Sequence, residues 1–171
     1  MSQDSHHSYA LWDTLRFMQF ITLSTHEYAP LLGLVRFQRH HKLWTPSPWG
    51  QAVTAGLEEL RSHEGPVLSE DFVVMPNHIH LIAHFKSSDR RLSHNFVTTC
   101  KHMLASAMRA ASPTTKPLWN KSFQAQTIHS QQALEALSAS LCNHHERWQY
   151  DSLYVPHPTE SLAKPPSLPY P

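Results

Sequence analysis

The chain has 171 residues, an apolar fraction of 40% and a formal net charge of +1, which together favour one globular domain. The near-neutral charge excludes nucleic-acid binding through overall charge, so any such binding must come from a local basic patch. No apolar run is long enough for a membrane span, and neither a signal peptide nor a disulfide framework is indicated. We therefore expect a cytoplasmic protein. Its 15 histidines weaken any single histidine as evidence for a site.

The first half of the predicted domain contains a strand, a loop and a helix. After a polar lead-in over residues 1–15, the segment Arg16–Thr25 is rich in β-branched and aromatic residues and predicts a strand. Tyr28–Pro48 has mixed polarity and several prolines, and we interpret it as a loop. A helix is predicted from Pro48 to Gly65-Pro66. Its apolar stripe consists of Trp49, Val53, Leu57 and Leu60.

Two strands and a long helix follow. Val67–Met75 and His78–Phe85 predict strands, and the break between them would pair them in an antiparallel way. A helix then runs from about Ser87 to the prolines at 113–117, with apolar residues at a period of 3.6. Its stripe includes Leu92, Phe96, Cys100, Leu104 and Met108.

The last elements are a short strand, a helix and a proline-rich tail. Leu118–Ile128 is predicted to hold a strand, and Ser130 is a suitable N-cap for a helix from Gln131 to about Gln149. Residues 152–171 contain six prolines, so we expect an extended tail that can bind a partner. The order β-α-β-β-α-β-α over residues 16–151 predicts an α+β domain, with helices packed on an antiparallel sheet.

A pair of histidines on the predicted strand 78–85 is the main candidate site. Alternate residues of a strand point to the same face, so His78 and His80 project together while Ile79 and Leu81 face the other layer. Two neighbouring imidazoles can hold one divalent cation. The spacing alone fits equally well with two polar residues on a half-exposed strand.

The wider segment is more informative. Phe72–Ile82, with the sequence Phe-Val-Val-Met-Pro-Asn-His-Ile-His-Leu-Ile, resembles the HUH motif of the IS200-like single-tyrosine transposases and the REP-associated tyrosine transposases. Weaker matches extend the resemblance to about residues 16–156. They are Phe20–Thr25, Leu92-Ser93, Lys101, Leu118-Trp119, Phe123, and Asn143 with Trp148 and Asp151.

The resemblance implies a ferredoxin-like fold and a role in transposition on single-stranded DNA, often at a hairpin. In such enzymes the histidine pair holds Mg²⁺ or Mn²⁺, which polarises the scissile phosphate. A tyrosine on the last helix attacks that phosphate and forms a covalent link, so that rejoining needs no ATP. A polar side chain four residues after the tyrosine completes the metal shell.

The expected tyrosine is missing. The resemblance places the nucleophile at Ser140, and no tyrosine occurs between Gly33 and Gln149. Tyr150 is a candidate relocated nucleophile, or simply an aromatic residue near the helix end. Ser140 would need activation that no neighbouring base supplies.

His144 occupies the position four residues after Ser140. If the last helix packs over the sheet, His144 would reach the pair, and three imidazoles would favour a transition metal. A surface histidine is the other interpretation.

Three functions remain open on the sequence alone. The first is a transposase-derived protein that binds single-stranded or hairpin DNA and has lost or altered strand transfer. The second is an active metal-dependent endonuclease that uses Tyr150, Ser140 or a metal-bound water. The third is a protein-interaction module, and a homodimer is compatible with each. Candidate phosphate contacts are Arg36, Arg39, Lys42, Arg90, Arg91 and Lys101, supported by His102.

Overall fold

The computed structural model describes residues 17–38, 41–62, 67–87 and 89–156. The strands are β1 (Met18–Ser24), β2 (Gly33–Gln38), β3 (His41–Pro46), β4 (Val67–Val74), β5 (His78–Phe85) and β6 (Gln124–Thr127). The α-helices are α2 (Pro48–Ser62), α3 (Arg90–Ala111) and α4 (Gln131–Cys142). Two short 3-10 helices are η1 (His26–Tyr28) and η2 (Trp148–Tyr150).

A four-stranded sheet forms the centre of the fold, in the order β4-β5-β1-β6. Each strand pairs with its neighbours in an antiparallel way. This is the predicted α+β architecture, with the strand order of a ferredoxin-like sheet. The strand with the histidine pair, β5, is one of the two central strands.

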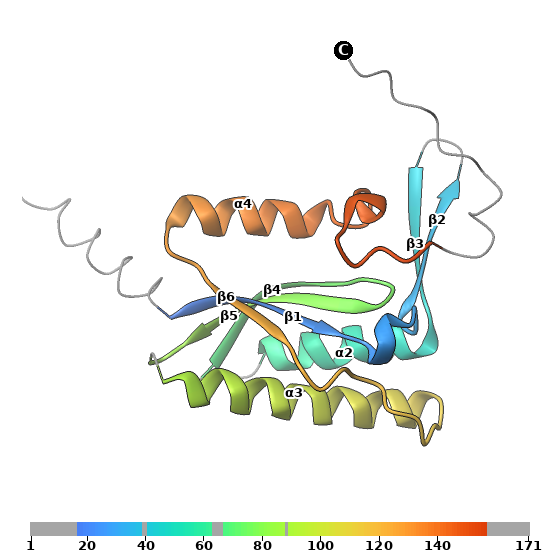
Figure 1. Cartoon of the computed structure of the whole chain (residues 1–171), viewed down its shortest axis with the longest axis horizontal. Coiled ribbons are helices and arrows are strands. Elements are labelled where there is room, and N and C mark those ends of the chain that lie inside the picture. The colour runs from blue at the N-terminus through green and yellow to red at the C-terminus, as the bar shows by residue number, and fades with distance from the viewer. Residues whose placement is uncertain (1–16, 39–40, 63–66, 88, 157–171) are drawn as a thin grey trace, which may run out of the picture.

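Helices cover both faces of the sheet (Figure 1). The α4 helix lies on one face, and α2 and α3 lie on the other. The core under α2 and α3 contains Ile79 and Leu81 of β5 and, from the predicted stripe of α3, Cys100 and Leu104. Val97 of α3, which was not part of that stripe, also belongs to this core. A second core under α4 contains Ile82, Ile128, Leu141 and Trp148. Among the described helices, none combines the length and apolar character of a membrane span.

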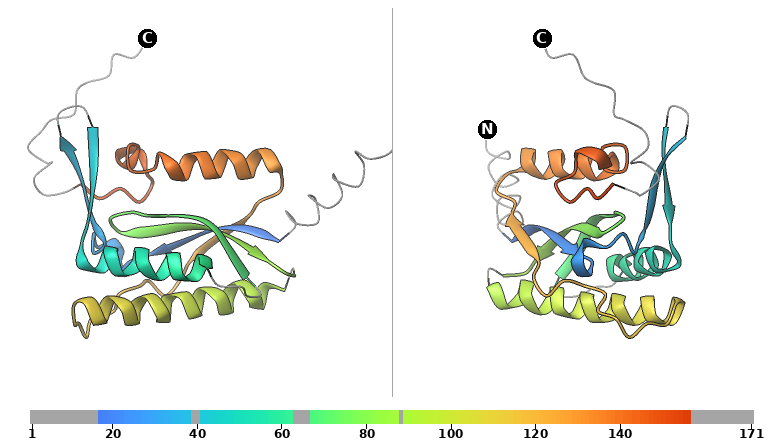
Figure 2. Two further views of the ribbon diagram at one scale, coloured as in Figure 1. Left: turned by 180° about the vertical axis from the view of Figure 1, so that it is seen from behind. Right: turned by 45° about the vertical axis from the view of Figure 1, so that its right-hand side comes forward.

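The segment Tyr28–Pro48 is not a loop, contrary to the sequence-based interpretation. It contains a separate antiparallel hairpin of β2 and β3, which stands beside the end of α4 in both views of Figure 2. Val35 and Trp44 face each other in its register and contribute to the core under α4. The prolines lie at the ends of the hairpin, where they leave its hydrogen bonds intact.

The last helix is shorter than predicted. It ends at Cys142, because the amide of Asn143 bonds to the carbonyl of Ser140 and that of His144 bonds to the carbonyl of Leu141. These bonds span three residues and replace the helical pattern by turns. His144 therefore lies on a turn after the helix.

The strand predicted within Leu118–Ile128 is also shorter than expected, and it consists of β6 alone.

Candidate functional site

His78 and His80 lie on the face of β5 that α4 covers. Both are buried, with 0% and 8% of their surface exposed. In the register with β1, Thr22 lies directly opposite His80. The strand alternation that keeps Ile79 and Leu81 in the other core thus holds the two imidazoles side by side, with ring centroids 4.4 Å apart.

Four side chains converge at this point. The Nε2 atoms of His78 and His80 are 3.0 Å apart. Oδ2 of Asp151 lies 2.9 Å from Nε2 of His144, 3.5 Å from that of His78 and 3.9 Å from that of His80. One donor atom from each of the four residues lies within 4.8 Å of the others. We call these four residues the His3Asp cluster.

Neighbouring polar groups orient the two strand histidines. Nδ2 of Asn77 donates to the carbonyls of Tyr28 and Leu153, which fixes the amide and turns Oδ1 towards Nδ1 of His78 at 2.9 Å. Because Oδ1 only accepts, Nδ1 of His78 carries the proton and Nε2 presents a lone pair to the cluster. Nδ1 of His80 lies 2.8 Å from Oγ1 of Thr22. Such partners on the second ring nitrogen are typical of metal-binding histidines.

The electrostatics of the cluster favour the metal-binding states of His78, His80 and Asp151. Burial, with the nearby His80, lowers the pKa of His78 to about 3, and burial also lowers the pKa of His80. Burial alone would raise the pKa of Asp151, but the imidazoles of His144 and His80 and the amide of Leu153 hold it well below its ordinary value. Neutral imidazoles and an ionised carboxylate are the forms that bind metal ions.

The donor set therefore fits a divalent metal ion. Imidazole nitrogens and a carboxylate oxygen are standard ligands, and a bound ion would supply positive charge between them. Asp151 was absent from the sequence-based ligand set, although it was part of the Trp and Asp pattern in the family resemblance. The predicted helix continued to Gln149. In such a helix Asp151 would lie beyond the reach of the histidines, so Asp151 was not predicted as a ligand.

The two candidate nucleophiles are not members of the cluster. Ser140 lies in the last turn of α4 and is half-buried. Tyr150 lies at the end of η2 with 71% of its surface exposed, and its ring is 5.9 Å from Nζ of Lys42.

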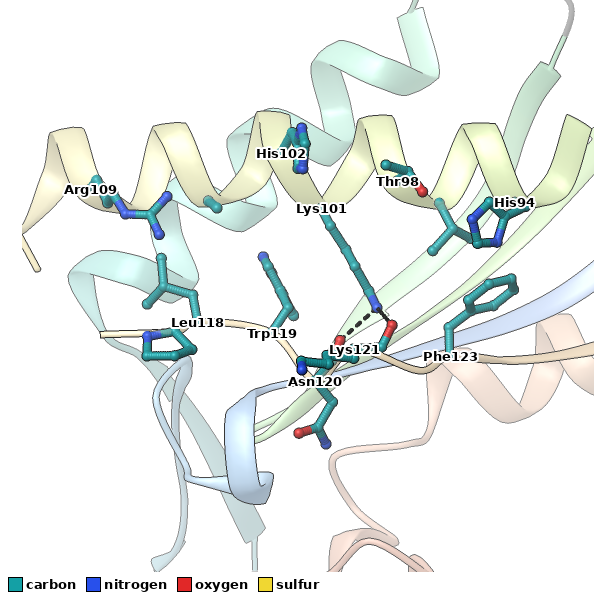
Figure 3. A pocket seen from close by; sticks show the side chains of 13 residues that line it. His94, Thr98, Lys101, His102, Arg109, Leu118, Trp119, Asn120, Lys121 and Phe123 are labelled. Carbon is teal, nitrogen blue, oxygen red and sulfur yellow. Dashed lines mark hydrogen bonds between the residues drawn. The ribbon is translucent and has the colours of Figure 1, made fainter. Parts of the chain in front are cut away.

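A second feature is a groove between α3 and the segment 117–123, on the other side of the sheet (Figure 3). It has a volume of about 620 Å³. Its basic lining residues are His94, Lys101, His102, Arg109 and Lys121, and no carboxylate is among the described residues that line it. Phe123 adds partly exposed aromatic surface. Trp119 is buried in the core under α3, and its Nε1 has no hydrogen-bond partner among the described residues. We call this feature the α3 groove.

The predicted phosphate contacts are dispersed over the molecule. Lys101 lines the α3 groove, where its ammonium donates to the carbonyls of Asn120, Lys121 and Ser122 at 2.7, 3.2 and 2.9 Å. Arg36 and Arg91 are exposed, on β2 and α3. Lys42 donates to the carbonyl of Glu146. Arg39 and the side chain of Arg90 lie outside the described part of the chain.

Together, the fold and the cluster define an α+β protein with a histidine-rich candidate metal centre. No protein-family model and no curated protein matches the chain. Among solved structures, the chain is similar to a candidate transposase from Deinococcus radiodurans, with 18% identity, a TM-score of 0.49, and coverage of 75% of this chain and 90% of that chain. It is also similar to a REP-associated tyrosine transposase bound to a REP hairpin, with 14% identity, a TM-score of 0.48, and coverage of 80% and 70%.

Proposed function

We propose that this protein is a transposase-derived, metal-binding protein that binds single-stranded or hairpin DNA and has lost or altered tyrosine strand transfer. The His3Asp cluster carries this proposal. It joins the histidine pair of the transposase-like segment to two further side chains that can bind a metal ion.

The α3 groove supports the DNA-binding part of the proposal. Three cationic side chains, Lys101, Arg109 and Lys121, line the groove without a carboxylate among its described lining residues. They give a local positive potential although the net charge of the chain is close to zero. Phosphate binding at such a site releases counterions and is strengthened at low salt. The partly exposed ring of Phe123 adds a surface on which an unpaired base can stack, a feature of single-strand binding sites.

The positions of the candidate nucleophiles support the altered catalysis. Ser140 stands at the position where the family resemblance places the tyrosine, and it has no activating base in the described hydrogen bonds. Tyr150 is largely exposed on η2 rather than on α4. Metal ions in this chemistry polarise a phosphate, but strand transfer also needs a positioned nucleophile.

Fluorescence anisotropy with three labelled DNAs tests the proposal: a hairpin with a single-stranded extension, an unstructured single strand and a blunt duplex. We expect the first two to bind more tightly than the duplex at low salt. Replacing both Arg109 and Lys121 by Glu should weaken binding by about tenfold or more through the loss of phosphate contacts. The double variant Arg61→Glu/Lys86→Glu, at two exposed residues outside the groove, is the matched charge control.

Two results would contradict DNA binding through the groove. One is equal affinity for the three DNAs, or none, at modest salt. The other is an equal loss of affinity in the groove variant and in the control variant of the same net charge, which would reflect overall charge alone.

A further inference from the structure

The donor atoms of the His3Asp cluster select the kind of ion. Three of the four are imidazole nitrogens. Mg²⁺ and Ca²⁺ are hard ions that prefer oxygen ligands, and Mg²⁺ usually keeps several waters. Zinc and neighbouring transition metals bind imidazole well. The cluster is therefore better suited to a transition metal than to Mg²⁺.

The spacing of the donor atoms fits four-coordinate binding. Ligand atoms about 2.0–2.1 Å from a tetrahedral zinc ion lie about 3.3 Å from one another. The separations of 2.9, 3.0, 3.5 and 3.9 Å between the donor atoms lie on either side of that value. All four donor atoms lie within 4.8 Å of one another, so an ion at the centre would draw the more distant groups inwards.

The cluster is enclosed by protein. The side chains of His78, Asp151, His80 and His144 are 0%, 6%, 11% and 19% exposed. Structural zinc sites are closed by four protein ligands, whereas catalytic sites keep one position open for water or substrate. With four inward donors and little solvent access, the cluster has the features of a closed site.

The ligands also connect distant parts of the chain. His78 and His80 belong to β5, while His144 and Asp151 lie on either side of η2, in the turn segment that follows α4. Trp148 in that segment packs near the ring of His78, with centroids 6.0 Å apart. An ion bound by all four would thus fasten the turn segment to the sheet.

We propose that the His3Asp cluster is a closed, tetrahedral site for a transition-metal ion of the zinc type, and that the ion cross-links β5 to residues 143–154. This inference rests on the metal-binding part of the proposed function. It assigns the ion a structural role, with no coordination position left for a DNA phosphate.

Cobalt substitution tests the geometry. Four-coordinate Co²⁺ absorbs visible light far more strongly than six-coordinate Co²⁺, so the spectrum reports coordination geometry. We expect one Co²⁺ per chain, with intense bands that do not change when azide or a single-stranded oligonucleotide is added. Weak octahedral bands would overturn the closed site, as would a spectrum that shifts on addition of azide.

Thermal unfolding and the hydrogen exchange of backbone amides test the cross-link. Zn²⁺ should raise the melting temperature of metal-free protein, whereas Mg²⁺ at the same concentration should not. Bound Zn²⁺ should also slow the hydrogen exchange of the backbone amides in residues 143–154 by at least about tenfold. Both effects should be lost in His80→Ala and Asp151→Asn but kept in His84→Ala, a half-buried residue on the same face of β5 and outside the cluster.

The variants remain informative if one of them folds poorly, because Asp151→Asn preserves the size of the side chain. Equal stabilisation by Mg²⁺ and Zn²⁺, or no slowing of exchange in residues 143–154, would overturn the cross-link. DNA affinity measured with the α3 groove variants is a separate readout. A failure of the closed site is thus distinguishable from a failure of DNA binding.

Discussion

Nε2 of His78 lies 3.5 Å from Oδ2 of Asp151, with 0% and 6% of the two side chains exposed. This contact joins the middle of the sheet to the residue that follows η2. A buried carboxylate beside imidazoles is unfavourable unless it is paired or binds a metal ion. The contact therefore connects the fold of the turn segment to the chemistry of the candidate metal centre.

Asn77 should be important for both stability and metal affinity. Its side chain bonds to Tyr28, Leu153 and His78 while fully buried. Asn77→Ala leaves these partners unsatisfied, and we expect a loss of about 1–3 kcal/mol in the free energy of unfolding by urea. Zinc affinity, measured by calorimetry, should fall about 10–100-fold because His78 loses its orienting partner. Asn95→Ala, on the exposed side of α3, should change neither value.

Two glycines of α2 should respond differently to alanine. A Cβ atom on Gly50 would lie 1.8 Å from the backbone oxygen of Leu32, whereas one on Gly56 would lie 2.9 Å from the flexible end of Leu104. Gly50→Ala should therefore destabilise the protein by about 1–3 kcal/mol or more. In Gly56→Ala, the higher helix propensity of alanine, about 1 kcal/mol, offsets part of the strain. Equal urea midpoints for the two variants would contradict the close approach at Gly50.

The two cysteines should differ in reactivity. Cys100 is buried in the core under α3, and burial raises the pKa of its thiol to about 12. Cys142 is exposed at the end of α4. Because the thiolate is the reactive form, a chromogenic disulfide reagent at pH 8 should label one thiol in native protein and two in guanidinium chloride. Rapid labelling of Cys100 in the native state would indicate a looser core.

The α+β architecture and the histidine face of β5 were predictable from the sequence, because both depend on local periodicity. Alternation along residues 78–85 places His78 and His80 on one face. The β2–β3 hairpin was missed since its prolines resemble loop signals, although they only flank its strands. Asp151 could not be assigned to the cluster because its position depends on where α4 ends. That end is set by turn hydrogen bonds after Ser140 rather than by any apolar pattern.

A covalent protein–DNA adduct should not form. With labelled hairpin DNA and Mn²⁺, denaturing gels should show no shifted protein band. The described hydrogen bonds provide no base for Ser140, and Tyr150 is 71% exposed on η2 rather than on α4. Tyr150→Phe and Ser140→Ala should behave like the unaltered chain. An adduct that disappears in Tyr150→Phe would instead demonstrate a relocated nucleophile and an active transposase.

The most direct test of the metal centre is anomalous X-ray scattering from crystals of the protein grown with Zn²⁺, recorded above and below the zinc absorption edge. The account predicts one strong peak per chain, about 2.0–2.2 Å from a donor atom of each of His78, His80, His144 and Asp151. The absence of a peak at that position would contradict the proposed metal centre. A zinc ion coordinated only by His78 and His80, with waters in the remaining positions, would contradict the closed site. It would indicate an open centre of the catalytic type instead.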